Sequence, residues 1–159
     1  MFWKMILFAM NLKFKMNKIE NISEYLLNYQ IKPSMQRLAI MEYLLANRIH
    51  PTAEDVYHAL YSKIPTLSKT TVYNTLNLFV AQGALRMLVI DEKNVRFDID
   101  TSLHAHFKCQ QCMRVYDLPV ENMDMVKVAD ETVGQITEMQ LYYKGYCKHC
   151  LQGQKGKIN

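Results

Sequence analysis

The sequence predicts an α/β (α+β) chain, with an N-terminal winged helix-turn-helix followed by a small β-β-α-β domain. Four amphipathic helical segments precede two short strand-like segments within residues 21–99. After Asp100 the pattern changes to strands around a single helix, and all four cysteines lie beyond residue 108. The change in pattern predicts a domain boundary near Asp100.

Length and composition indicate a globular protein. The chain has 159 residues, of which 50% are hydrophobic and 21% are charged, so it is neither disordered nor fibrous. The formal net charge is only +4. Any surface for nucleic acid must therefore come from local clustering rather than from overall basicity.

Residues 1–15 form an N-terminal extension. Their apolar start, MFWKMILFA, is too short to span a bilayer, and no small-x-small cleavage site follows it. We interpret the extension as a flexible arm or as a start upstream of the true one at Met16. No association with a membrane is predicted.

The first two helices are predicted from apolar spacing. Residues 21–29 place apolar side chains at helical intervals, and Pro33 suits the first turn of a second helix over 34–46. The predicted apolar positions are Ile22, Leu26 and Tyr29 in the first helix, and Leu38, Met41 and Leu45 in the second, flanked by Met35, Ile40 and Leu44.

The third and fourth helices have clear start signals. Thr52 is the predicted N-cap of a helix over about 52–61, and Ser68 is that of a helix that ends at Gly83. Their predicted buried residues are Val56, Ala59 and Leu60, followed by Val72, Leu76, Phe79 and Val80.

The fourth helix also has a polar face that carries no acidic residue. Hydroxyls and amides can bond to base edges in a major groove, and a tyrosine ring can contact a thymine methyl. Ordinary surface helices are also polar, but two strands follow, over 84–90 and 94–99, and complete a winged helix in residues 16–100. The candidate DNA contacts are Lys69, Thr70, Thr71, Tyr73 and Asn74, with Asn77 on the same face.

The second domain, residues 101–152, is predicted to have a thin core. Strands are expected over 104–109, 113–118 and 135–146, with a helix near 120–132. So small a unit needs a metal or a partner subunit to be stable. A polar tail is expected from Gln152, with residues 153–159 outside the domain.

The cysteines form two CxxC pairs, the usual spacing of a structural zinc site. Four thiolates give a closed tetrahedral shell without an open position for catalysis. Two disulfides or an iron-sulfur cluster are the alternatives, and we expect a reducing cytoplasm. The candidate ligands are Cys109, Cys112, Cys147 and Cys150.

Histidines and aspartates offer a second metal site. His104 and His106 are two residues apart on a predicted strand, so both imidazoles lie on one face. Such a pair is also common on surfaces and in cores, and spacing alone does not bring it together with His50, Asp98 and Asp117. Imidazoles and carboxylates together suit Fe²⁺, Mn²⁺ or Zn²⁺.

The other two histidines have simpler interpretations. His58 is read as a surface or packing residue of the third helix. His149, between two cysteines, is read as a solvated turn residue.

Six segments resemble the ferric uptake regulator (Fur) family and occur in its order. They cover about residues 30–150. The resemblance implies a dimeric, metal-dependent repressor that binds double-stranded DNA, with an N-terminal winged helix and a C-terminal dimerisation domain. The segments are PSMQRLAIMEYL, HPTAEDVY, LSKTTVYNTLNLFVAQG, RFD, HAHFKCQQC and KGYCKHC.

Within that family, the chain resembles the peroxide-responsive repressor (PerR) branch. Asn74, two aspartates at the metal positions and Ser102-Leu103 in place of a histidine run favour this branch over the iron-uptake and zinc-uptake regulators, which stay as alternatives. The resemblance implies structural Zn²⁺ at the cysteines, and peroxide as the signal, through oxidation of His50 or His104. It also implies regulatory Fe²⁺ or Mn²⁺ at His50, Asp98, His104, His106 and Asp117.

Two alternatives come from other functional classes. A zinc hydrolase could use the histidines, but it would need an open metal position and a general base, and the chain has no HExxH segment. A metal-storage or protein-interaction module is the other. The hydrolase would also leave the winged helix unexplained.

Overall fold

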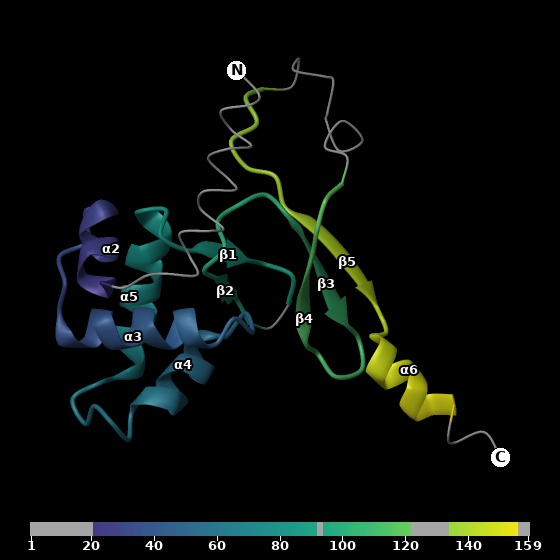
Figure 1. Cartoon of the computed structure of the whole chain (residues 1–159), viewed down its shortest axis with the longest axis horizontal. Helices are drawn as coiled ribbons and strands as arrows, with labels where there is room; N and C mark the ends of the chain where they lie inside the picture. Colours follow the sequence, from purple (N-terminus) through teal and green to yellow (C-terminus); the bar gives the residue numbers. More distant parts are fainter. Residues whose placement is uncertain (1–20, 92–93, 122–133, 156–159) are drawn as a thin grey trace. The chain divides into compact units, whose positions relative to one another are not determined.

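The computed structural model describes residues 21–91, 94–121 and 134–155, which form two compact units divided between Ser102 and Leu103 (Figure 1). No helix within these residues is long and apolar enough to cross a membrane. The first unit contains α2 (Ile22–Asn28), α3 (Met35–Ala46), α4 (Ala53–Leu60), α5 (Lys69–Ala81), β1 (Arg86–Leu88) and β2 (Arg96–Asp98). The second contains β3 (Ala105–Cys109), β4 (Val115–Leu118), β5 (Leu141–Gly145) and α6 (Lys148–Lys155).

Each helix of the first unit begins at a residue whose side chain accepts a bond from the first turn. The Thr52 hydroxyl accepts from the Asp55 amide, and the Asp55 carboxylate accepts from the Thr52 amide, which makes a capping box. Ser68 caps α5 in the same way, through the Thr71 amide. Both predicted N-caps are thus confirmed.

The core of the first unit is formed by all four helices and the hairpin. Val56, Val72, Leu76 and Phe79 are fully buried, as the sequence predicts. Burial of each such side chain stabilises the fold by about 1.5–3 kcal/mol.

The predicted apolar stripe of α3 is wrong in part. Ile40, Met41 and Leu44 are its buried residues, whereas Leu38 and Leu45 are only partly buried. The reason is that α3 packs against both α2 and α4, so its buried face is centred between two neighbours rather than on one.

The hairpin behind α5 is shorter than predicted. Gly83, with φ +74°, ends α5 in the left-handed conformation that favours glycine. The antiparallel strands β1 and β2 then pair Arg86 with Asp98 and Met87 with Phe97. The helices followed by this hairpin form the predicted winged helix-turn-helix.

The sheet of the second unit has the order β4-β3-β5. Strand β3 is antiparallel to β4 and parallel to β5, as Figure 1 shows. The helix predicted near 120–132 lies mostly outside the described residues. The strand predicted over 135–146 is confined to Leu141–Gly145, because its pairing partner β3 has only five residues.

The frayed polar tail predicted from Gln152 is wrong as far as Lys155, and residues 156–159 lie outside the described residues. Residues Lys148–Lys155 form helix α6, and the Leu151 amide bonds to the Cys147 carbonyl at 3.0 Å. The second CxxC pair thus lies at the start of a helix, where residues three apart share a face.

Candidate metal centres and DNA-facing helix

The four cysteines converge within the second unit. Cys109 ends β3, Cys112 follows in the turn to β4, and Cys147 and Cys150 lie at the start of α6. Their sulfur atoms lie within 4.8 Å of one another, and Cys112 Sγ is 3.8 Å from Cys147 Sγ. A tetrahedral zinc shell with Zn–S bonds of about 2.3 Å has sulfur–sulfur edges of about 3.8 Å. The donors therefore fit zinc, and none of the four is in a disulfide.

Backbone amides and burial make these thiols unequal. The Cys147 amide donates to Cys109 Sγ over 3.3 Å. The backbone N–H groups of Cys112 and Cys147 together lower the pKa of Cys109 to about 6, because they stabilise its thiolate. Burial raises the pKa of Cys150 to about 12. A metal ion that binds all four sulfurs must displace the Cys150 proton.

A second cluster of donors is formed by His104, immediately before β3, His106 in β3 and Asp117 in β4. Strand alternation puts His104 and His106 on one face, and the register places Asp117 directly opposite His106. The His104 Nε2 and His106 Nε2 atoms are 2.9 Å apart, and they lie 3.4 Å and 3.8 Å from Asp117 Oδ1. Both histidines are buried, whereas Asp117 is half exposed. We call these three residues the β3–β4 cluster.

The first unit carries the other two predicted donors as a buried pair. His50 Nε2 lies 3.9 Å from Asp98 Oδ2, and the other Asp98 oxygen accepts from the Asp100 amide at 2.9 Å. His50 has φ +52°, an uncommon conformation for a residue with a Cβ atom. Strain of this kind persists only where surrounding contacts impose it.

The contacts that hold His50 come from β2. Arg96 Nη1 donates to the His50 carbonyl over 3.1 Å, and the Phe97 amide donates to the Pro51 carbonyl over 3.0 Å. The loop is thus bonded to the strand that carries Asp98. Sequence reasoning missed Arg96, because its partner lies 46 positions away. The available signal was an arginine on a predicted strand, two positions before the candidate ligand Asp98.

Helix α5 presents most of its predicted DNA contacts to solvent. Lys69, Thr70, Tyr73 and Asn74 are exposed, Tyr73 by 52%. Lys69 forms an ion pair with Glu54, whose pKa is lowered by the hydrogen bond and the charge of Lys69. Thr71 shares a hydrogen bond of 2.8 Å with Ser68.

The remaining polar residues of interest are placed as follows. Asn77, predicted on the DNA-facing side, is half-buried. His58 is exposed and lies 3.4 Å from Glu54, which fits the surface interpretation. His149 is exposed, but it belongs to α6 rather than to a turn.

Known proteins resemble this chain in sequence and in fold. Residues 28–143 match the ferric uptake regulator family. The peroxide operon regulator of Bacillus subtilis is 34% identical over 136 residues, which cover 84% of this chain and 94% of that protein. The peroxide-responsive repressor PerR of Staphylococcus epidermidis is 34% identical over 122 residues, covering 76% and 81%. The crystal structure of the ferric uptake regulator of Vibrio cholerae superposes with a TM-score of 0.66 at 25% identity, covering 80% and 100%.

Proposed function

Because the chain belongs to the ferric uptake regulator family, we propose that it is a metal-dependent, DNA-binding transcriptional repressor that responds to peroxide. The observation that carries the proposal is the β3–β4 cluster, in which three metal-binding side chains lie 2.9–3.8 Å apart. It occurs in a chain that is 34% identical to a peroxide operon regulator. The same relatives favour peroxide over iron or zinc uptake as the signal. The zinc-hydrolase alternative is wrong, because the family and the relatives are regulators and repressors.

Two metal ions with different roles belong to this proposal. The four cysteines hold Zn²⁺ as a structural ion, in a shell that is closed to other ligands. His50, Asp98, His104, His106 and Asp117 hold Fe²⁺ or Mn²⁺ as a regulatory ion, since imidazoles and carboxylates suit both. We also place the protein in the reducing cytoplasm, which fits the four cysteines because none of them is in a disulfide.

The regulatory ligands come from both units, and the switch depends on this division. When bound, the ion supplies a shared coordination shell and, as Fe²⁺, the one-electron chemistry that activates peroxide. His50 and Asp98 belong to the unit with α5, and the β3–β4 cluster belongs to the second unit. Repression then requires all five side chains at once, because metal binding favours only the conformation in which all five can bind the ion.

DNA recognition in this proposal is by a homodimer. Two copies of α5 enter successive major grooves of a palindromic operator, with Tyr73 and Asn74 toward the bases. Dimerisation falls to the second unit, whose thin core needs a partner as well as zinc.

Peroxide ends repression through a histidine ligand. One oxygen atom passes from peroxide to the imidazole ring of His50 or His104, and the remainder of the peroxide leaves as water. The oxidised ring loses a donor lone pair, so the shell loses a ligand. The cysteines are not the sensor in this proposal, since all four are bound to zinc as structural ligands.

His104→Ala tests the regulatory site. Duplex DNA selected by the wild-type protein from a random library serves as the operator. The variant should lose the Mn²⁺-dependent gain in operator affinity, whereas His58→Ala, which removes an exposed histidine of α4, should keep it. Unchanged Mn²⁺ dependence in His104→Ala would refute the site.

A further inference from the structure

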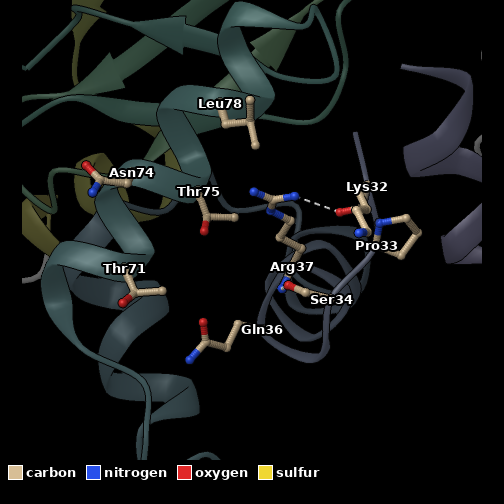
Figure 2. Close-up of a pocket in the computed structure, with 9 residues that line it drawn as sticks. All are labelled: Lys32, Pro33, Ser34, Gln36, Arg37, Thr71, Asn74, Thr75 and Leu78. Atoms are coloured by element: carbon tan, nitrogen blue, oxygen red, sulfur yellow. Dashed lines mark hydrogen bonds between the residues drawn. The ribbon is translucent and has the colours of Figure 1, made fainter. Parts of the chain in front are cut away.

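A polar cavity of about 420 Å³ lies between α3 and α5, entirely within the first unit. Figure 2 shows Thr71 and Thr75 of α5 on one wall, and Gln36 and Arg37 of α3 on the other. This volume falls in the range of ligand sites rather than of packing defects.

The charge of the cavity is positive. Lys32 and Arg37 both line it, and none of the described residues that line it is acidic. Within the described part of the chain, neither side chain is paired with a carboxylate. Arg37 Nη1 donates to the Lys32 carbonyl over 2.7 Å, and since a guanidinium has five N–H donors, most remain for a ligand. The cavity therefore favours an anion.

Thr75 gives an independent indication of a ligand. The residue is only 7% exposed, and its hydroxyl bonds to none of the residues that the structure describes. Figure 2 shows the hydroxyl oxygen directed into the space between the two helices. The hydroxyl oxygen is not itself a fully buried atom, so it is accessible from the cavity and can bond to whatever occupies it.

The start of α3 adds a positive end to the same cavity. Ser34 is its N-cap and accepts from the Arg37 amide over 3.3 Å. The other amides of the first turn have no partner within the helix. Together with the helix dipole they attract anions, phosphate groups in particular.

We propose that this cavity seats one backbone phosphate of bound DNA, held by Arg37, the Thr75 hydroxyl and the first turn of α3. The inference rests on the proposed function, since α5 is the helix that enters the groove. Asn74 lines the cavity and also belongs to the exposed face of α5, beside Tyr73. A DNA strand that borders the groove entered by α5 therefore passes the cavity. The contact fixes the register of α5 without reading sequence.

Two substitutions and one matched control test the seat. Arg37→Gln should weaken binding to the selected operator and to unrelated duplex equally, by about tenfold, and should lower the slope of log affinity against log salt by about one. Thr75→Val, which keeps the side-chain shape, should weaken both by a smaller factor. Arg48→Gln removes the same charge beyond the opposite end of α3 and should change affinity less than about twofold.

A neutral phosphate identifies the contact. Operators that carry a single uncharged methylphosphonate are compared position by position. At the seated phosphate, Arg37→Gln and Thr75→Val should cause no further loss, because the interaction is already absent. Losses that add at every backbone position would overturn the seat.

The measurements also distinguish a cavity that binds a free anion from a protein that does not bind DNA at all. If both variants keep full DNA affinity while the wild-type protein binds inorganic phosphate in calorimetry and Thr75→Val does not, the ligand is a free anion and the DNA assignment is overturned. If the metal-loaded wild-type protein binds no duplex at all, the proposed function itself is contradicted, and the seat with it.

Discussion

Arg96 donates a hydrogen bond from Nη1 to the backbone carbonyl of His50 over 3.1 Å. Its guanidinium also lies 3.4 Å from the Asp91 carboxylate, and two residues later Asp98 ends β2. One side chain thus joins the loop that carries one candidate metal ligand to the strand that carries another. Its role is to position His50, because Arg96 itself offers no lone pair to a metal.

Arg96→Met should weaken binding of the regulatory metal. Groups that orient metal ligands typically contribute tenfold to a hundredfold to affinity, so we expect Mn²⁺ to bind at least about tenfold more weakly, with zinc content unchanged. Arg96→Lys keeps the charge but not the two-pronged geometry, and it should be intermediate. Lys63→Met, at an exposed position, is the control. Mn²⁺ affinity equal to that of the wild type, measured by calorimetry, would show that Arg96 has no positioning role.

Cys112→Ser should remove the structural zinc. The expected content is one zinc per chain in the wild type and none in the variant, measured by elemental analysis. Because metal binding is coupled to folding, the second unit should then unfold at a lower temperature. Gln110→Ser, at an exposed polar position of the same turn, is the control. Full zinc content in Cys112→Ser would contradict the four-cysteine assignment.

Zinc affinity should fall steeply as the pH is lowered. The pKa of Cys109, at about 6, lies below that of an ordinary thiol, so its thiolate is present above pH 6 and is lost as the pH falls through that value. Cys150, with its pKa raised to about 12, carries a proton that zinc must displace over the whole neutral range. The apparent affinity should therefore fall at least about tenfold for each pH unit. A chromogenic chelator measures it, and a flat profile between pH 8 and pH 5 would contradict the prediction.

Tyr73 and Lys69 should affect DNA binding in different ways. Tyr73 is exposed, and if its ring reads bases as proposed, Tyr73→Ala should weaken operator binding by about tenfold to a hundredfold while unrelated duplex is little affected. Lys69→Ala removes a positive charge at the start of α5, where a phosphate contact would be independent of sequence, so it should weaken binding to both duplexes equally. Fluorescence anisotropy on the two duplexes separates these outcomes. Equal losses for Tyr73→Ala would exclude base reading by this residue.

Local signals made much of this molecule predictable from its sequence. Thr52 and Ser68 are caps whose partners lie three residues away, so short-range chemistry determines them. The shared face of His104 and His106 follows from strand alternation alone. Their approach to Asp117 does not, because it depends on the register of β3 against β4, and a shift by one residue would turn Asp117 to the other face.

Long-range packing explains what the sequence did not predict. Arg96 and Thr75 have neighbours far away in the chain, so neither residue type indicates its role. Helix α6 was missed because most of its eight residues are polar, one is Gly153, and its only apolar side chains are those of Cys150 and Leu151. The buried face of α3 depends on which helices flank it, which spacing along α3 cannot reveal.

The central claim is that peroxide ends DNA binding through a histidine of the regulatory site, and one measurement tests it most directly. Operator affinity and metal content are determined for the Fe²⁺ and Mn²⁺ forms before and after peroxide, with mass spectrometry of the histidine peptides on the same samples. We predict that the Fe²⁺ form alone loses operator affinity, with one added oxygen atom on His50 or His104 and zinc retained. Release of DNA from the Fe²⁺ form with both histidines unmodified would contradict the account.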